Sequence, residues 1–165
     1  MRVKLRIATA ADVADLVSLR VAANRRLTAQ YGEGYWSGGV TEKGVLFAMR
    51  TSSVYVARYR GRLIATLTLS AKKPWAIDRN YFSPSQRPLY LTSMAVHPNE
   101  QRKGIGWLAI EEARRIARKW PSDAIRLDAW NAAAGAGGFY RKCGFREVGR
   151  ALYRNAPLIY FEILL

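Results

Sequence analysis

Hydrophobic and polar residues alternate with two different periods along this chain, and stretches of the two kinds follow one another. Residues 2–7 show the short period, because Val3, Leu5 and Ile7 alternate with basic residues, and this predicts a strand with one buried face. Both faces of the stretch 89–96 are apolar, so we expect that strand in the centre of a sheet. The other predicted strands are residues 54–59, 63–69, 125–129, 145–149 and 158–164.

Helical spacing of apolar residues marks the stretches between these strands. Thr9, with Asp12 three residues later, is predicted to cap a first helix. The most regular helix begins at Ile105 and is ended by Pro121. Two further helices are predicted at residues 41–50 and, rich in Gly and Ala, at 131–142. Alternating strands and helices predict an α/β fold, and 165 residues suffice for one domain over residues 1–165.

Length and composition exclude several classes of protein. Half of the residues are hydrophobic, which excludes a disordered chain, and no apolar run approaches the roughly 20 residues of a membrane span. The first six residues alternate charged and aliphatic side chains instead of forming the apolar core of a signal peptide, so we expect a cytoplasmic protein. Cys143 is the only cysteine and His97 the only histidine, so neither a disulfide nor a zinc cluster is expected.

The net charge is unusual for a chain of this size. Lys and Arg number 27 and Asp and Glu 12, which gives +15. A field of this sign favours anionic partners such as phosphorylated cofactors, nucleic acid or acidic membranes, without distinguishing among them. The basic residues are spread along the whole chain, so nucleic acid is only weakly supported as a partner. We expect no membrane partner, and a monomer or a homodimer.

A glycine-containing segment links the central strand to the most regular helix. Gly104 and Gly106 have no Cβ atoms, the first N–H groups of the helix have no partner within it, and Arg102 and Lys103 add full charges. Such a segment suits a diphosphate. Two glycines are also what a sharp turn into a helix requires, so the Gly-x-Gly pair alone does not decide. The segment matches neither the Rossmann nor the Walker pattern.

The residues around this segment resemble the acyl-CoA signature of the GNAT superfamily of N-acyltransferases. That signature is an apolar strand ending in Ala-Val-x-Pro, here Ala95 to Pro98, followed by Gln/Arg-x-x-Gly-x-Gly/Ala, here Gln101 to Gly106. A second block, Tyr140 to Phe145, is similar to the family's Tyr-x-x-x-Gly-Phe. The resemblance implies a GNAT fold, which is an α/β fold with a central mixed, largely antiparallel sheet, splayed middle strands and flanking helices.

The resemblance also implies acetyl-CoA as co-substrate, and no metal. In the family the pantetheine arm lies between the strands that are here residues 89–96 and 125–129, and it bonds to strand backbone like an extra strand. Backbone N–H groups at the start of the following helix hold the diphosphate. Trp107 stands where the family often has Ser or Thr, so a hydroxyl contact is lost and the backbone donor remains. The implied cofactor-binding residues are Met94, Ala95, Val96, Gln101, Arg102, Lys103, Gly104, Ile105, Gly106, Trp107 and Asn131.

The implied reaction is attack of a neutral primary amine on the thioester. A backbone N–H near Val96 would polarise the carbonyl, and Tyr140, the implied catalytic residue, would give a proton to the departing thiolate. Without the resemblance, Tyr140 would simply be expected to pack against the sheet. Asn131 stands nine residues before the Tyr, where the family commonly has seven, so it is either a cofactor contact or a helix cap.

No general base stands out in the sequence. Some family members carry a carboxylate on the central strand, where this chain has Tyr90. Asp128 is expected to pair with Arg126, and His97, beside the diphosphate segment, is expected to be structural. Cys143 is expected to be a small buried hydrophobe and not a nucleophile.

The acceptor is not determined by the sequence. The implied activity is an acetyl-CoA-dependent N-acetyltransferase acting on a small amine or an amino acid. Two alternatives remain: a non-enzymatic basic binding module, and a GNAT enzyme that acts on a macromolecule such as a peptide, a protein or a charged tRNA. Six aromatic residues fall in the stretches expected to wall the acceptor site, either as a binding surface or as a lid that packs on itself: Tyr31, Tyr35, Trp36, Trp75, Tyr81 and Phe82.

Overall fold

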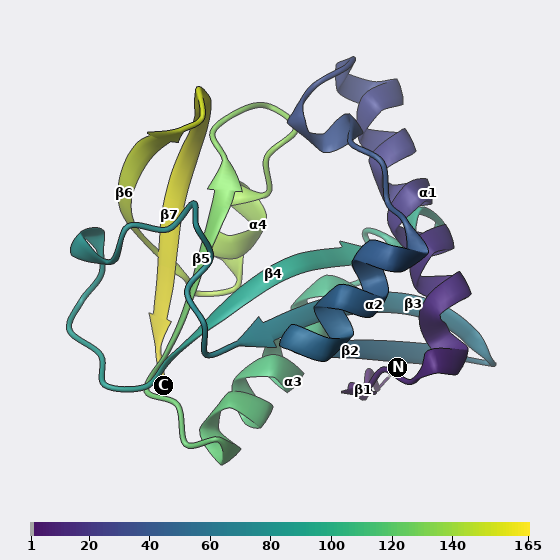
Figure 1. Ribbon diagram of the computed structural model, residues 1–165, viewed down its shortest axis with the longest axis horizontal. Helices are drawn as coiled ribbons and strands as arrows, with labels where there is room; N and C mark the ends of the chain where they lie inside the picture. Colours follow the sequence, from purple (N-terminus) through teal and green to yellow (C-terminus); the bar gives the residue numbers. More distant parts are fainter. Residues whose placement is uncertain (1) are drawn as a thin grey trace.

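One seven-stranded sheet organises the chain (Figure 1). The computed structural model describes residues 2–165; Met1, which belongs to the N-terminal stretch and to the domain range considered above, lies outside the described residues. The strand order is β1-β2-β3-β4-β5-β7-β6. The strands are β1 (Arg6–Ile7), β2 (Ser53–Tyr59), β3 (Arg62–Ser70), β4 (Pro88–Val96), β5 (Ala124–Trp130), β6 (Arg146–Tyr153) and β7 (Ala156–Leu164).

The sheet splits in its middle. All neighbouring strands pair antiparallel except β4 and β5, which are parallel and pair only over Pro88–Tyr90 and Ala124–Arg126. Beyond these residues β4 remains paired with β3, and β5 remains paired with β7, so the sheet divides into two halves. The predicted α/β fold, with a mixed, largely antiparallel sheet, splayed middle strands and flanking helices, is therefore confirmed.

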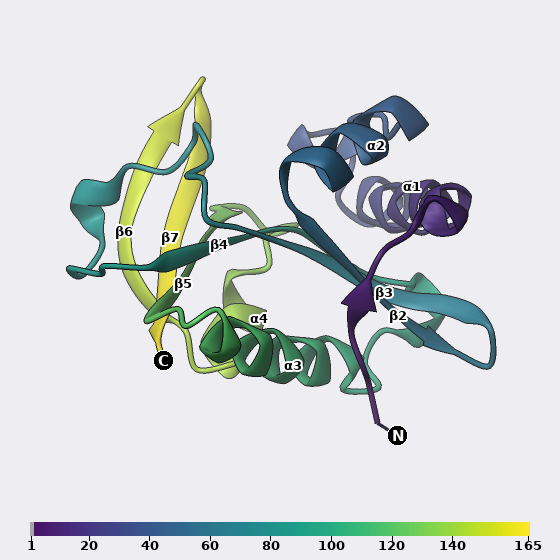
Figure 2. The ribbon, with the colours of Figure 1, turned by 60° about the horizontal axis from the view of Figure 1, so that its bottom comes forward.

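The helices cover both faces of this sheet (Figure 2). Helices α1 and α2 lie on one face, and α3 and α4 on the other. Four of the five buried residues of α3 recur at the four-residue spacing of the predicted stripe: Ile105, Ala109, Ala113 and Ala117. Trp120, also predicted on this stripe, is 40% exposed. The helices are α1 (Val13–Tyr31), α2 (Glu42–Thr51), α3 (Ile105–Lys119) and α4 (Gly137–Lys142).

The N-terminal strand is much shorter than the sequence predicts. Only Arg6–Ile7 pairs with β2, although Val3 and Leu5 are buried in the main core. The predicted contact between Thr9 and Asp12 is present, since the Thr9 N–H donates to Asp12 Oδ2 at 2.8 Å. Asp12 also binds the guanidinium groups of Arg6 and Arg58, both at 2.8 Å. This carboxylate fixes the point where the edge of the sheet passes into α1.

The predicted helix over residues 131–142 is wrong in its first half. The chain turns after β5, and α4 begins only at Gly137. Gly135 explains the turn, because a Cβ there would lie 1.8 Å from the Trp130 carbonyl oxygen. Gly135, Gly137 and Gly138 also make this segment a poor helix former. Within residues 2–165, no helix is long and apolar enough to cross a membrane.

Candidate active site

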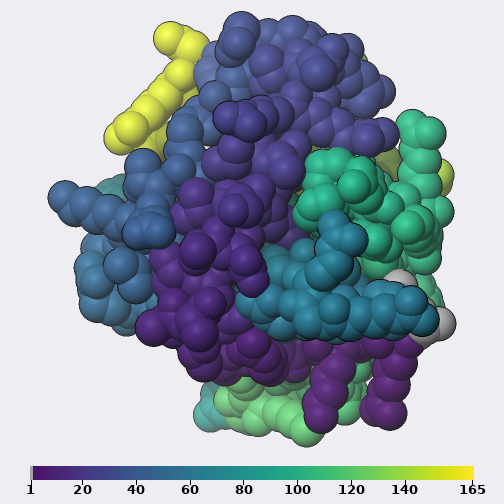
Figure 3. Space-filling model, turned by 90° about the vertical axis from the view of Figure 1, so that its right-hand side faces the viewer, coloured from purple at the N-terminus to yellow at the C-terminus, as the bar shows by residue number. Residues whose placement is uncertain are grey.

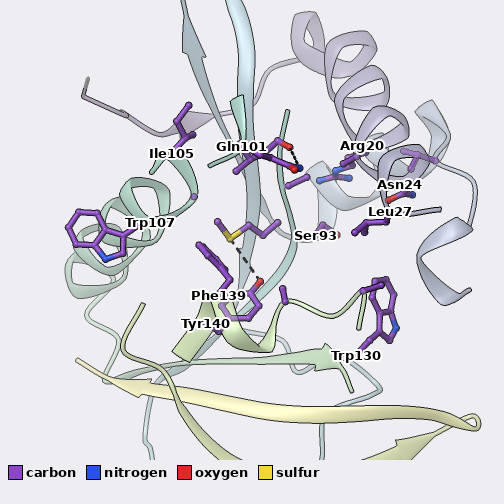
Figure 4. Close-up of a pocket in the computed structure, with 18 of the residues that line it drawn as sticks. Arg20, Asn24, Leu27, Ser93, Gln101, Ile105, Trp107, Trp130, Phe139 and Tyr140 are labelled. Atoms are coloured by element: carbon purple, nitrogen blue, oxygen red, sulfur yellow. Dashed lines mark hydrogen bonds between the residues drawn. The ribbon is translucent and has the colours of Figure 1, made fainter. Parts of the chain in front are cut away.

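A cavity of about 960 Å³ opens where β4 and β5 diverge. It is lined by β4, the N-terminal end of α3, α4, the cavity-facing side of α1 and the N-terminal end of α2. Because α1 and α3 lie on opposite faces of the sheet, the cavity reaches both faces through the split (Figures 2 and 4). Ten of the twelve site residues expected from the sequence line it: Met94, Ala95, Val96, Gln101, Arg102, Gly104, Ile105, Gly106, Trp107 and Tyr140.

The β4 wall of the cavity contains a bulge. The register against β3 shifts between Thr66 and Thr68, and Ser93, opposite this shift, has a φ of +51°. A bulge of this kind bends a strand and increases its twist, which favours the divergence of β4 from β5. The sequence carries no local sign of it, because serine is not a residue that marks a left-handed position.

Beyond the bulge, β4 turns backbone groups toward the cavity. The His97 N–H donates to the Ile64 carbonyl at 2.8 Å, so Val96 and Ala65 form a non-hydrogen-bonded pair. The N–H and C=O of Val96 therefore point away from β3, and the carbonyl accepts a bond from Gln101 Nε2 at 3.1 Å. The Val96 N–H is therefore a backbone hydrogen-bond donor on the side of β4 that faces away from β3.

The segment between β4 and α3 has the geometry of an anion site. Arg102 and Gly104 have φ values of +63° and +78°, so the backbone turns sharply before α3. The first N–H groups of α3, at Ile105, Gly106 and Trp107, have no helical partner, and all three residues line the cavity. Successive backbone N–H groups at a helix N-terminus are suited to a phosphate.

The two positions of this segment require glycine for different physical reasons. Gly104 is needed for its positive φ, and no atom lies within 4 Å of a Cβ placed there. At Gly106 a Cβ would lie 3.0 Å from the Phe139 ring, so this glycine lets α4 pack closely against the first turn of α3. The simple expectation that both glycines admit a ligand is therefore incomplete.

Tyr140 stands in the middle of the cavity wall (Figure 4). Its ring is 7% exposed and contacts Phe139, Phe145 and Phe161 at centroid distances of 5.2, 5.6 and 6.0 Å. Its hydroxyl lies 4.0 Å from the Met94 sulfur. Burial raises the pKa of Tyr140 well above its ordinary value, and the negative charge of Asp128 raises it further. The hydroxyl therefore keeps its proton at neutral pH.

Lys103 and Asn131 do not line the cavity. The ammonium group of Lys103 lies 3.0 Å from Glu100, and its side chain is 55% exposed. Asn131 is exposed, and its backbone N–H donates to Pro157 at 2.9 Å, which anchors the turn after β5. Neither residue contributes to the walls of the cavity.

The candidates for a general base, Asp128 and His97, do not line the cavity. The expected ion pair between Asp128 and Arg126 is absent from the described chain, because Arg126 donates to Tyr90 Oη at 3.2 Å and to the Ser83 carbonyl at 2.7 Å. Burial raises the pKa of Asp128. His97 Nδ1 accepts from the Asn99 N–H at 3.2 Å, a structural contact.

Cys143 is buried as expected, and it also lines the cavity. Burial raises the pKa of its thiol to about 11, so it is protonated at neutral pH and a poor nucleophile. Among residues 2–165, no group of three or more His, Cys, Asp or Glu side chains could hold a metal ion.

The particular residues that form the cavity wall on the α1 side were not identified from the sequence. Arg20, Ala23, Asn24 and Leu27 face the cavity along one side of α1, and Val40, Thr41 and Gly44 face it from the start of α2. The α1 residues are spaced three and four positions apart, which places them on one side of a helix and was the available sequence signal. Nothing in the sequence distinguishes Arg20 from the many other basic residues. Figure 3 shows the outer side of α1, whose purple atoms lie beside the green atoms of the segment after β4.

The six aromatic residues assigned to the acceptor region do not form one cluster. None of them lines the cavity. Trp36 approaches it through Trp130, a cavity residue whose ring lies 5.9 Å away, edge to face. The Tyr35 hydroxyl donates to the Asn155 carbonyl at 3.2 Å, which links the α1–α2 loop to the β6–β7 turn. Tyr81 and Phe82 pack against Tyr160 instead, and Trp75 is 85% exposed.

A sheet split between two parallel strands, with unpaired N–H groups at a helix start and a buried tyrosine at the split, is the arrangement expected for the class of acyl-CoA-dependent transferases. The family model "Acetyltransferase (GNAT) family" matches residues 21–145. The chain therefore belongs to the GNAT acetyltransferase family, whose members use acetyl-CoA and an acceptor. A search of curated proteins found no significant match to this sequence.

Solved structures share the fold at low sequence identity. The ribosomal-protein-S18-alanine N-acetyltransferase from Escherichia coli superposes with a TM-score of 0.71 at 14% identity, covering 98% of this chain and 93% of that one. A GCN5-related N-acetyltransferase from Rhodopseudomonas palustris gives 0.74 at 17% identity, covering 100% and 97%. The ribosomal-protein-alanine N-acetyltransferase from Brucella melitensis gives 0.69 at 20% identity, covering 98% and 99%. At these identities the likeness supports the fold alone.

The residues at the split fit acetyl-CoA. The free N–H groups of α3 and the cations of Arg102 and Lys142 suit its phosphates, and the unpaired edges of β4 and β5 suit its amide-containing arm. The volume lies at the upper end of the range of small-molecule sites, which leaves room for both a cofactor arm and a small acceptor.

Proposed function

We propose that the protein transfers the acetyl group of acetyl-CoA to the primary amine of a small amine or an amino acid, by direct attack on the thioester. One N-acetyltransferase domain over residues 1–165 would carry this activity. The observation that carries the proposal is a cavity that passes through the split sheet, with the helix start of α3 on one face and α1 on the other. Such a passage lets donor and acceptor meet from opposite faces.

Acetyl-CoA supplies the activated acyl group, and the residues of this chain bind and orient the reactants. The N–H groups from Ile105 to Trp107, with Arg102, would hold the diphosphate. The backbone of Met94, Ala95 and Val96 would hold the pantetheine arm. The Val96 N–H would bond to the carbonyl oxygen as negative charge develops there. Lys103 would contribute only to the long-range positive potential that attracts the cofactor, since its ammonium group pairs with Glu100. Asn131 would help by anchoring the turn after β5.

Tyr140 would supply the proton for the leaving thiolate. Its hydroxyl faces the cavity beside Met94, on the wall shared with the proposed pantetheine path. Burial raises the pKa of Tyr140, which makes its proton harder to release. The leaving thiolate would be desolvated in the same cavity, and its proton affinity would rise for the same reason.

The amine would arrive neutral, because no residue of the described chain offers a carboxylate or an imidazole to the cavity. Arg20, Arg102 and Lys142 line it, and their positive charge disfavours the protonated form of an amine. The enzyme would select the free amine from solution and would not need a dedicated general base.

The test is an acetyl-CoA turnover screen against amines, amino acids and short peptides, with release of free CoA as the readout. Turnover above the acceptor-free rate with at least one small amine supports the proposal. Binding of acetyl-CoA without turnover on any of them would overturn the small-acceptor assignment.

A macromolecular acceptor is the second candidate, and the net charge of +15 favours it. Two structural neighbours are described as ribosomal-protein alanine N-acetyltransferases. Binding of labelled RNA, measured at two salt concentrations, distinguishes this candidate from the small-acceptor one. Binding that survives moderate salt would favour an acceptor that contains nucleic acid.

A further inference from the structure

Arg20 is a cation that forms no ion pair with any described residue. It lies in the middle of α1, on the side that faces the cavity. Its Nε and Nη2 atoms are buried and have no hydrogen-bond partner among the described residues. Burial lowers the pKa of Arg20. By contrast, Arg6, Arg58 and Arg146 bind the buried carboxylates of Asp12 and Glu162.

An unpaired guanidinium of this kind destabilises the fold, because desolvation of a cation costs free energy that nothing here returns. An unsatisfied buried polar group calls for a physical reason, and an ion or ligand that completes its bonding is one such reason. The N-terminal end of α2, at Thr41 and Gly44, also lines the cavity and adds partial positive charge. An anionic group of a ligand fits this position.

The position of Arg20 distinguishes the acceptor from the cofactor. Helix α3, which begins after Arg102, and helix α4, which ends at Lys142, lie on one face of the sheet, whereas α1, which carries Arg20, lies on the other face (Figure 2). Farther along the same side of α1, Leu27 lies two turns away, about 10 Å along the axis. Leu27 and Trp130 supply apolar surface there.

We infer that Arg20 binds the carboxylate of the acceptor, which is an amino acid with an apolar side chain directed toward Leu27 and Trp130. This inference rests on the proposed function. A guanidinium binds a carboxylate through two parallel hydrogen bonds, which also fixes the orientation of the molecule. With its acid group held at Arg20, the amine of such an acceptor faces the middle of the cavity, where β4 and Tyr140 lie.

The experiment compares L-phenylalanine with L-phenylalaninamide, which share the amine and side chain and differ in the negative charge. Values of kcat/KM are expressed per concentration of free amine, because the two amines have different pKa values. The wild-type protein is expected to prefer the acid at least tenfold. Arg20→Met is expected to lose that preference while the KM for acetyl-CoA stays unchanged. Arg26→Met, at an exposed position of the same helix, is the matched control and should retain it.

Two further readouts separate the inference from the proposed function. Calorimetric binding of N-acetyl-L-phenylalanine, compared with its amide, needs no turnover and should depend on Arg20. Arg20→Met should also raise the melting temperature, because it removes a buried unpaired cation, whereas a merely structural arginine would lower it when lost.

The following results would overturn the inference. One is equal use of acid and amide by the wild-type protein, or an acid preference that survives in Arg20→Met. Another is a raised KM for acetyl-CoA in Arg20→Met, which would assign Arg20 to the cofactor phosphates. Absence of acetyl transfer to any amine, with Arg20-dependent binding of the carboxylate probe intact, would instead overturn the proposed function alone.

Discussion

Tyr140 combines a structural role and a proposed chemical role in different parts of one side chain. The ring packs among Phe139, Phe145 and Phe161, while the hydroxyl lies 4.0 Å from the sulfur of Met94. Because the two parts are separable, a substitution that removes the oxygen alone tests the chemistry without disturbing the packing.

Tyr140→Phe is expected to lower the single-turnover rate of acetyl transfer by about 10²–10⁴-fold, the usual contribution of a general acid. Acetyl-CoA affinity and the melting temperature should change little. Since burial raises the pKa of Tyr140, loss of its proton should not reduce the wild-type rate below about pH 10. A Phe variant with the wild-type single-turnover rate would remove Tyr140 from the mechanism and leave the proton to water or the acceptor amine.

Cys143 gives a second prediction at this scale. Its thiol has a pKa raised to about 11 by burial. Only the thiolate reacts with Ellman's reagent, so below pH 11 the rate should rise about tenfold per pH unit. At pH 8 we expect the native protein to react at least 100-fold more slowly than a free thiol with a pKa of about 8.5. Unfolding in guanidinium should restore the ordinary rate, whereas a native rate that levels off near pH 9 would contradict the raised pKa.

At the scale of the elements, the backbone geometry at the start of α3 determines the proposed binding of the cofactor diphosphate. Its unpaired N–H groups face the cavity, Gly104 supplies the left-handed turn before them, and Gly106 permits the contact with Phe139. A substitution at Gly106 therefore acts in two ways, through contact with α4 and through any charge placed at the helix start.

Gly106→Asp is expected to weaken acetyl-CoA binding at least tenfold, about 1.4 kcal/mol, because it places a negative charge at the proposed diphosphate site. Calorimetry measures the affinity, and a thermal melt followed by circular dichroism checks the fold. Gly106→Ala is the matched control, since it adds the Cβ near Phe139 without the charge. If Ala and Asp weaken binding equally, the effect is steric; unchanged binding in the Asp variant would remove this segment from the cofactor site.

At the scale of the whole molecule, the net charge of +15 should assist capture of an anionic cofactor. Raising ionic strength from 0.1 to 1 M shortens the Debye length from about 10 to about 3 Å, so acetyl-CoA should associate more slowly as salt is added. Stopped-flow association rates across this range measure the effect. A flat dependence would mean that the surplus charge serves another partner, and the macromolecular acceptor would gain support.

Much of the site could be predicted from short stretches of sequence, but not all of it. The segment from Gln101 to Gly106 is contiguous, so its resemblance to a family signature could be recognised in the sequence, whereas the two glycines alone did not distinguish a phosphate site from a sharp turn. Lys103 and Arg102 look equivalent in sequence, yet only Arg102 lines the cavity, because Lys103 turns to Glu100. Arg20 carried no local signal at all, since its lack of partners depends on what α1 packs against.

The sequence by itself determined the order and kind of the elements, because the periodicity of apolar residues, glycines and prolines acts on the chain locally. It determined the start of α3 for the same reason, whereas the place of Tyr140 at the site was implied only by the resemblance of residues 140–145 to a family motif. Only the tertiary structure decided that β4 and β5 separate after Tyr90 and Arg126, that the N-terminal strand pairs over two residues, and that the buried Nε and Nη2 atoms of Arg20 have no partner among the described residues. Strand pairing and burial depend on neighbours that are distant in sequence, and the cavity that joins the two faces of the sheet exists only where those neighbours diverge.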